Sequence, residues 1–297
     1  MIYSISVVDD ADGFRRIEEL QKIIWGFSDI SIVPTIALKT AVQTGGVLLG
    51  AFSQDDNEMI GFVLGYTATQ NGNSFHYSTM TGVIPDKRFG GVGYALKVQQ
   101  RAVVLSQKID RIVWVYDPLE SLNGYFNILK LGSICRRYEN NYYGDMRDQL
   151  NKGLPTDRFY VEWFLNSARV HSRLNKSEVA KSIDIYPIVN STTLKSGCLC
   201  NVDWKLDCKG DRVFVEIPPN FQKIKKLEID LAYQWRLQTR TIFKHYFDQG
   251  YVVTNLVTAF EHGEKKCFYV LEKQGLEQVL TNTSTYIPVQ SRALAYV

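Results

Sequence analysis

Apolar residues recur at helical spacing near the start of the chain. Phe14, Ile17 and Leu20 lie three positions apart, acidic residues precede them, and a glycine follows the segment. This spacing places the apolar side chains on one face, and a glycine just past the end is a frequent helix stop. The pattern predicts an amphipathic helix over residues 10–26, and a stretch rich in Ala, Leu and Lys predicts a second helix over 34–43.

Short apolar runs separated by polar loops then predict a sheet. The run at 111–116 is almost continuously apolar, as in a strand buried on both faces. Together with the preceding strand and helix it forms a βαβ unit, whose strands are parallel with a right-handed crossover. The sequence therefore predicts an α/β fold with a mixed sheet, its early strands antiparallel and its central pair parallel. The predicted strands are 46–52, 59–66, 74–83, 111–116, 133–138 and 159–165, and the helices between them are 92–107 and 120–131.

The C-terminal part repeats an order of elements already seen. A polar link at 175–182 leads to strand 212–219, a helical region over 222–248, and two more strands. Residues 111–165 show the same strand, helix, strand, strand order. Either the segment 183–297 is a partial, degenerate echo of the first part, or it only shares a common βαββ arrangement. We expect two domains, residues 1–170 and a smaller α/β subdomain at 171–297.

Composition and charge exclude several classes of protein. The chain has 297 residues, 45% of them hydrophobic, and a net charge of +3 without a dense Lys/Arg run, so nucleic acid is not an expected partner. No apolar run approaches the ~18 residues of a membrane span, and no basic-then-apolar leader is visible at the N-terminus. These features predict a globular cytoplasmic protein that does not bind membranes.

The five cysteines point to reduced thiols rather than to disulfides or a metal. Their number is odd and the chain is long enough to fold without crosslinks. Cys198, Cys200 and Cys208 lie close together in the sequence, but no histidine is near and a fourth ligand would have to be the distant Cys267. We therefore expect no metal.

A glycine-rich turn follows the strand at 74–83. Arg88, Gly91 and Gly93 form an Arg-x-x-Gly-x-Gly pattern where a helix is predicted to begin. Glycines there permit a sharp turn and leave backbone N–H groups uncovered at the positive end of the helix dipole, which favours an anion such as a phosphate. The alternative is a tight strand-to-helix connection without a ligand.

This turn and the order of elements resemble the GNAT acyl-CoA N-acyltransferases. Several blocks are more similar to one branch, the predicted acetyltransferases that include an amino-acid N-succinyltransferase. The likeness covers most of the chain and implies the GNAT fold, with splayed central parallel strands. The segment after residue 183 would then be a degenerate GNAT half. The blocks include Gly45-Gly46-x-Leu48-x-Gly50-Ala51, Tyr94-x-Leu96-Lys97-x-x-Gln100-Arg101, Asp117-Pro118-Leu119, Leu154-Pro155-x-Asp157-Arg158 and Trp235-Arg236-x-x-Thr239-Arg240.

The resemblance implies how an acyl-CoA donor is held. The pantetheine arm would add to the first splayed strand as if it were another strand, and the pyrophosphate would lie on the N–H groups where the helix begins. Arg88 would add charge, and Asn123 matches a position that holds the arm near the sulfur. The implied main-chain contacts are Thr81, Gly82 and Val83 for the arm, and Phe89, Gly90, Gly91, Val92 and Gly93 for the pyrophosphate.

The residues for proton transfer depart from the family's pattern. Ile128 occupies the place of the usual tyrosine acid, and the central strand lacks the usual glutamate base. The candidates for catalysis are His76, whose imidazole titrates in a suitable range, Asp117 at the end of the second splayed strand, and Tyr143 in the long loop at 139–158. Tyr138, Tyr142 and water-relayed deprotonation are alternatives.

One arginine is a candidate for recognising a carboxylate on the substrate. Arg158 follows Asp157, so the two form an internal ion pair or the arginine binds a substrate carboxylate bidentately. Within the predicted helix 222–248, Trp235 and Arg236 are expected to be core and surface residues. The C-terminal subdomain is expected to shape the acceptor pocket or to make a homodimer contact.

Three functions remain open at this stage. The favoured one is direct transfer of an acetyl or succinyl group from acetyl-CoA or succinyl-CoA to a small amine or amino acid. A non-catalytic CoA-binding or interaction module is the second, because the usual acid and base are missing. Acylation of a protein or peptide amine is the third, and it calls for an open groove instead of an enclosed pocket.

Overall fold

The computed structural model describes residues 2–146, 148, 151–185, 187–261 and 263–288, without the side chains of Arg88 and Phe89. The chain divides into two compact units. The first consists of the described residues up to Trp114 together with Asp148, and the second of the remaining described residues from Val115 onward. This division falls inside a strand, so the domain predicted for residues 1–170 includes parts of both units.

The first unit is a sheet with helices on it. Its strands follow the order β1-β2-β3-β4-β5, and every pair is antiparallel except β4 with β5, which is parallel as predicted. Strand β5 begins in this unit and ends in the second. The elements are β1 (Tyr3–Val7), α1 (Ala11–Trp25), α2 (Thr35–Gln43), β2 (Val47–Ser53), β3 (Met59–Gln70), β4 (Asn73–Val83), the 3-10 helix η1 (Pro85–Gly90), α3 (Val92–Ser106) and β5 (Arg111–Tyr116).

Helix α1 forms for the reasons that its sequence indicates. The Asp10 carboxylate accepts a hydrogen bond from the Gly13 N–H at 2.6 Å, which caps the helix start. Gly26 ends it in the left-handed conformation, at φ 69°. The apolar positions of the predicted face, Phe14, Ile17 and Leu20, are buried against the sheet in one cluster.

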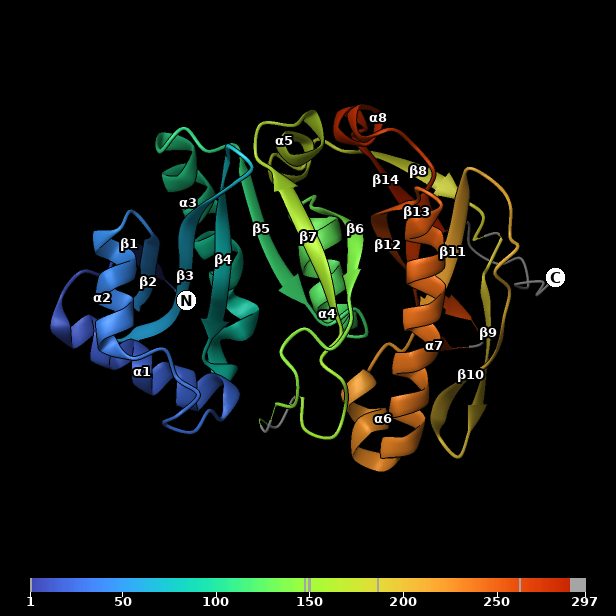
Figure 1. Ribbon diagram of the computed structural model, residues 1–297, viewed down its shortest axis with the longest axis horizontal. Coiled ribbons are helices and arrows are strands. Elements are labelled where there is room, and N and C mark those ends of the chain that lie inside the picture. Colours follow the sequence, from blue (N-terminus) through green and yellow to red (C-terminus); the bar gives the residue numbers. More distant parts are fainter. Residues whose placement is uncertain (1, 147, 149–150, 186, 262, 289–297) are drawn as a thin grey trace. The chain divides into compact units, whose positions relative to one another are not determined.

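The second unit continues from the last residues of β5. Its main sheet has the order β5-β7-β6-β12-β13-β11, with two-stranded sheets β9-β10 and β8-β14 beside it (Figure 1). The elements are α4 (Ser121–Gly124), the π-helical segment η2 (Tyr125–Lys130), β6 (Ile134–Glu139), β7 (Arg158–Phe164), α5 (Ala168–Leu174), β8 (Val179–Ile183), β9 (Asn190–Lys195), β10 (Cys198–Trp204), β11 (Arg212–Ile217), α6 (Phe221–Leu227), α7 (Ile229–Asp248), β12 (Val252–Glu261), β13 (Glu264–Glu272), α8 (Leu276–Thr281) and β14 (Ser284–Pro288).

The order of neighbouring strands in the sheet repeats, as does the order of elements along the chain. The elements β11, α7, β12 and β13 follow one another as do β5, α4, β6 and β7, and each third strand lies between the first and the second. The two sets meet at equivalent strands, β6 and β12, which pair through Cys135 and Val253. Because neighbour order repeats as well as element order, the topology supports the echo over a chance βαββ arrangement.

Some elements differ from the prediction. The helix expected over 120–131 is a short α4 followed by a π-helical segment, and the long helix over 222–248 is interrupted at Glu228, whose φ is −145°. The polar link at 175–182 contains strand β8, and strand β1 was not predicted. Except for α7, these elements (α4, η2, α6, β1 and β8) have seven residues or fewer, and apolar periodicity is weak over so few positions.

Candidate active site

Strand β4 has one edge with little strand pairing. On one side it pairs with β3 from Gln70–Asn73 to Gly61–Val83. On the other side, among the described residues, the ladder to β5 consists of two pairs, His76–Ile112 and Tyr77–Val113. The edge from Ser78 to Gly82 therefore lacks a strand ladder there, which is the form in which an extended ligand can add as a strand.

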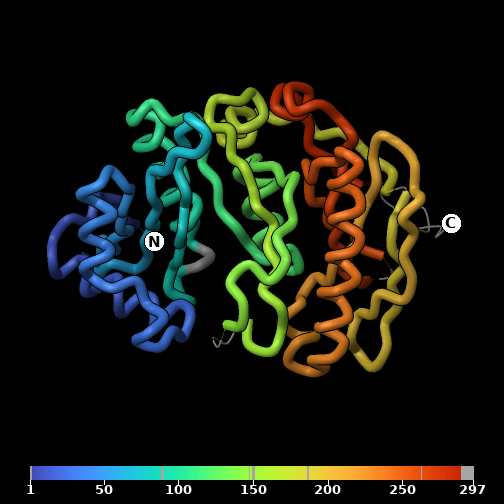
Figure 2. The backbone as a smooth tube through the Cα atoms, in the orientation of Figure 1, coloured from blue at the N-terminus to red at the C-terminus, as the bar shows by residue number. Residues whose placement is uncertain are grey.

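The open edge leads directly to the start of α3. The backbone passes from β4 through η1 into α3 (Figure 2). Gly91 has φ 77° and forms the helix N-cap, with no side-chain cap hydrogen bond among the described residues. The Ala95 N–H donates to the Gly91 carbonyl at 3.0 Å, so the N–H groups of Val92 and Gly93 precede the helical ladder. A positive φ favours glycine at position 91, and the geometry fits an anion at this helix end.

The predicted donor-binding residues of the first unit thus lie on one continuous stretch of backbone. Thr81, Gly82 and Val83 end β4, and Gly90 to Gly93 form the turn into α3. For Arg88 and Phe89 the structure gives the backbone only, so the contribution of the Arg88 charge lies outside the described side chains.

An indole ring covers Gly82 on the face of β4 toward α1. A Cβ atom at Gly82 would lie 2.7 Å from Trp25 Cη2, so only glycine fits here without displacing the ring. Trp25 stacks on Phe27 at 5.5 Å and meets the Phe62 ring edge-on at 5.9 Å. This face of the open edge is therefore apolar and aromatic.

His76 lies in a buried polar network and not in an accessible position. Its side chain is 0% exposed, and its Nε2 lies 3.1 Å from Gln100 Nε2. Because the amide nitrogen only donates, Nε2 accepts and the ring proton is on Nδ1, which has no hydrogen-bond partner among the described residues. Burial, with the charge of Lys97, lowers the pKa of His76 to about 3. A base this weak and this buried is a poor acceptor for an ammonium proton.

Lys97 and Gln100 of α3 were not among the predicted site residues. Lys97 Nζ donates to Ser78 Oγ at 3.0 Å and to Gln100 Oε1 at 2.8 Å, and its side chain is 2% exposed. Burial lowers the pKa of Lys97 to about 7. Both residues lie in the buried stripe of α3 that includes Leu96 and Val104. Polar residues at helical spacing within an apolar face are the sequence pattern that could have indicated their burial.

In the second unit, Asp117 forms an ion pair. Both of its carboxylate oxygens accept hydrogen bonds from the Arg236 guanidinium, Nη1 to Oδ1 at 2.7 Å, and its Oδ1 also accepts from the Leu119 N–H. Burial raises the pKa of Asp117, but the Arg236 charge outweighs this and the pKa lies below its usual value. Arg236 is 2% exposed, so its expected position at the surface is wrong.

Arg158 is also engaged with its own unit. The side chain is buried, and it donates to the Asp157 carbonyl at 2.9 Å and to Asn151 Oδ1 at 2.6 Å. An ion pair between Asp157 and Arg158, one of the two alternatives for these residues, is not seen among the described residues, and the Asp157 carboxylate pairs with Arg240 at 2.8 Å. Arg158 lies instead 4.0 Å from an Asp117 oxygen.

The two remaining candidates of the second unit are exposed. Tyr143 is 48% exposed, and its ring lies 5.4 Å from the Arg158 guanidinium carbon. Its backbone N–H donates to Thr156 Oγ1 at 2.9 Å, which fixes this part of the loop. Asn123 is an exposed residue of α4. Their proposed roles depend on the resemblance alone.

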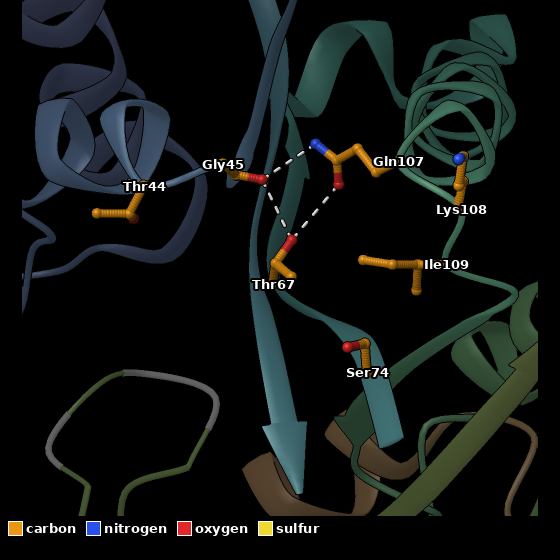
Figure 3. A pocket seen from close by; sticks show the side chains of 7 residues that line it. All are labelled: Thr44, Gly45, Thr67, Ser74, Gln107, Lys108 and Ile109. Carbon is orange, nitrogen blue, oxygen red and sulfur yellow. Dashed lines mark hydrogen bonds between the residues drawn. The ribbon is translucent and has the colours of Figure 1, made fainter. Parts of the chain in front are cut away.

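A shallow cavity of about 340 Å³ lies at the opposite end of α3 from Gly91 (Figure 3). Its polar wall is held by Gln107, whose Nε2 donates to the Gly45 carbonyl at 3.0 Å, and by Thr67, whose hydroxyl donates to the same carbonyl. None of the predicted site residues lines it. The lining residues are Thr44, Gly45, Thr67, Ser74, Gln107, Lys108 and Ile109.

Two kinds of feature are absent from the described residues: a membrane-spanning helix and a group of metal-ligating side chains. No helix in the ranges that the structure describes is long and apolar enough to cross a membrane. Within those same ranges, no three His, Cys, Asp or Glu side chains are grouped so as to hold a metal ion.

Comparison with known proteins gives structural likeness without sequence relatives. No protein-family model matches the chain, and no curated protein matches it. A chain of the NatC complex bound to Gag peptide and CoA is similar at 16% identity, over 55% of this chain and 98% of that one, with a TM-score of 0.45. A protein from Desulfovibrio desulfuricans assigned to the GNAT acetyltransferases is similar at 11% identity, over 55% and 99%, with a TM-score of 0.44. The PaiA N-acetyltransferase from Thermoplasma acidophilum, in complex with coenzyme A, is similar at 16% identity, over 55% and 98%, with a TM-score of 0.40.

Proposed function

We propose that the chain is a CoA-dependent N-acyltransferase of GNAT type, which moves an acetyl or succinyl group to the amine of a small molecule such as an amino acid. One observation carries this proposal. Among the residues that the structure describes, the edge of β4 from Ser78 to Gly82 shows no strand ladder toward β5, and it continues through Gly91 into a helix start for which no side-chain cap is seen. An extended amide-containing arm that ends in a pyrophosphate is complementary to both features.

The donor would be held mainly by main-chain groups. The pantetheine amides would bond the edge at Thr81 to Val83, and the pyrophosphate would accept from the N–H groups of Val92 and Gly93, which precede the helical ladder. Arg88 would add charge. We keep Asn123 as the residue that holds the arm near the sulfur. Main-chain recognition explains why glycines, and few distinctive side chains, mark this stretch.

The reaction is a direct transfer within a complex of donor and acceptor. The neutral acceptor amine attacks the thioester carbonyl, a C–N bond forms and the C–S bond breaks. The nitrogen loses one proton as it becomes an amide, and the CoA thiolate takes up one proton. The acceptor ammonium must first lose its proton. With its pKa at about 3, His76 does not serve as this base, and Asp117 is held by Arg236. We therefore propose that water relays this proton and that Tyr143 is the acid, while Arg158 remains our candidate for a substrate carboxylate.

A non-catalytic CoA-binding module is the second candidate function. It is favoured because two predicted catalysts are not available to accept a proton: His76 is buried, and Asp117 is ion-paired with Arg236. Such a module would bind the donor on the same backbone and would need no base. It predicts binding of CoA without turnover.

The test is the release of CoA thiol with acetyl-CoA and succinyl-CoA against a panel of D- and L-amino acids, simple amines and short peptides. We expect thiol release above the hydrolysis background with at least one small amine. Turnover of peptides alone would change the acceptor class to proteins. Binding of CoA without turnover of any acceptor would favour the non-catalytic module and contradict the proposed activity.

A further inference from the structure

Lys97 joins the two parts of the proposed donor site within the first unit. It lies on α3, about 7 Å along the helix axis from the N–H groups of Val92 and Gly93. Its Nζ reaches Ser78, the first residue of β4 beyond the ladder to β5. Through Gln100 the same network extends to His76, so one set of hydrogen bonds ties the helix that begins at Gly91 to the start of the open edge.

Two hydrogen bonds of this amine go to neutral groups. Lys97 Nζ donates to a hydroxyl and to an amide oxygen, and it lies 4.1 Å from the centroid of the Trp114 ring. The ring favours the charged amine, whereas removal from water favours the neutral one. With 2% of the side chain exposed, burial prevails and the pKa falls to about 7. Both protonation states are therefore populated near neutral pH.

Several titratable groups lie on the elements that pack against α3. On β4, His76 interacts with Lys97 and stays neutral because its pKa is about 3. The elements β1 and η1, which also pack on α3, contribute Tyr3, Asp86 and Lys87 near the helix start. Strands β2 and β3 present apolar positions on the face opposite the α1 cluster.

We propose that Lys97 is a positioning residue for the acyl-CoA donor, which ties the open edge of β4 to the phosphate-binding end of α3 and takes up a proton when the donor binds. This inference rests on the proposed function, because it needs an anionic donor at the start of α3. It adds a coupling between donor affinity and pH that the main-chain contacts alone would not produce.

The sign of the coupling follows from linkage. A pyrophosphate at the start of α3 would place negative charge on the helix that carries Lys97, and a nearby negative charge stabilises the charged form of a buried amine, so we expect donor binding to raise the pKa of Lys97. Protein with bound donor then holds more protons than free protein around pH 7. Donor affinity must therefore increase as the pH falls from above the free pKa to below it. A rise of about one pKa unit gives about tenfold tighter binding over that range.

The experiment is calorimetric binding of dephospho-CoA to the full chain. This probe lacks the 3′-phosphate, which itself titrates near pH 6 to 7, and keeps the ionised pyrophosphate. Titrations at pH 7.5 in two buffers of different ionisation enthalpy give the number of protons taken up. We expect uptake of a fraction of a proton, and affinity about fivefold to tenfold tighter at pH 6.5 than at pH 8.5.

Two variants separate this role from a general effect of charge. Lys97→Met should bind with no proton uptake and with affinity independent of pH. Lys39→Met removes one exposed positive charge on α2 and should behave as the wild type. Uptake that persists in Lys97→Met, or wild-type binding that is independent of pH, overturns the inference while leaving the proposed function intact. No binding of dephospho-CoA at any pH overturns both.

A measurement on the wild type covers the case in which Lys97→Met does not fold. In protein labelled with ¹³C at lysine Cε, one lysine should titrate near pH 7, far below the others. Its midpoint should move upward when dephospho-CoA is added. An unchanged midpoint with the probe bound, or the absence of any lysine that titrates below pH 9, contradicts the inference.

Discussion

At the scale of single residues, Asp117 and Arg236 show that a role depends on partners far along the chain. The two residues are 119 positions apart, and they form a bidentate pair in which the arginine is 2% exposed. A candidate catalyst in the sequence is thus an ion-pair partner in the structure. Arg236 Nε has no hydrogen-bond partner among the described residues, so Asp117 is the main compensation for a buried charge.

Breaking this pair on one side should be costly. Asp117→Asn leaves the Arg236 charge buried and uncompensated, and we expect a loss of about 3 kcal/mol in the free energy of unfolding, measured by urea denaturation. Arg240→Met leaves Asp157, which is 0% exposed, without this ion pair, but the carboxylate still accepts hydrogen bonds from the Tyr138 hydroxyl and the Asn141 N–H, so this variant should lose less. The double variant Asp117→Asn/Arg236→Met should recover part of the loss. Equal stability of Asp117→Asn and wild type would show that the pair is not the structural feature described here.

At the scale of elements, β11 holds the place in the second unit that β5 holds beside β4. A parallel bridge joins Phe214 to Ile188, as Val113 is joined to Tyr77. Beyond the bridge, the Asn190 side chain closes the edge of β11. It accepts from the Glu216 N–H at 2.8 Å and donates to the Glu216 carbonyl at 3.0 Å. A side-chain amide thus bonds both backbone groups of Glu216, whereas in the described part of β4 the edge from Ser78 to Gly82 lies beyond the two ladder pairs with β5.

Asn190→Ala should therefore destabilise the second unit. Both backbone groups of Glu216 would lose a partner at a site where Asn190 is 1% exposed, and we expect a loss of about 2 kcal/mol in the free energy of unfolding. Asn201→Ala is the matched control, because Asn201 Oδ1 accepts one hydrogen bond, from Asn190, and no backbone group depends on it. A loss for Asn201→Ala as large as for Asn190→Ala would contradict this account of the β11 edge.

Apolar periodicity predicted the elements whose faces are fully buried, and it failed for the others. Helix α1 and strands β2 to β5 follow from runs such as Phe14 to Ile24 and 111–116, because burial of one face fixes the pattern. Strand β1 has a half-exposed pattern at the sheet edge, and η2 is π-helical, so neither has a distinctive period. Lys97 was missed because a lysine on a helix normally faces water.

At the scale of the whole molecule, the glycine-rich backbone turn was predictable, and the surroundings of the candidate catalysts were not. The backbone from Thr81 to Gly93 depends on glycine positions and on the order of elements, both of which are local. The low pKa of His76 depends on its burial and on the charge of Lys97, and its hydrogen bond is to Gln100. Asp117 is paired with Arg236, and all these partners meet only when the chain folds. No local pattern records such pairings, since they join residues of different elements.

The central claim, that this backbone holds an acyl-CoA, is tested most directly by donor binding to a pair of glycine variants. Gly91 and Gly72 have nearly equal positive φ, 77° and 76°, and in neither case would a Cβ meet a heavy atom closer than 3.8 Å. Gly91→Val and Gly72→Val should therefore suffer similar backbone strain, about 1–2 kcal/mol. Only Gly91→Val places a side chain beside the N–H groups at the start of α3.

The measurement is the dissociation constant of acetyl-CoA, by calorimetry, for the wild type and both variants at one pH and salt concentration. We predict that Gly72→Val binds like the wild type, within about twofold, and that Gly91→Val binds at least tenfold more weakly, a loss of about 1.4 kcal/mol or more. Equal affinity in all three proteins, or no binding by the wild type, would contradict the claim that residues 81–93 hold the donor.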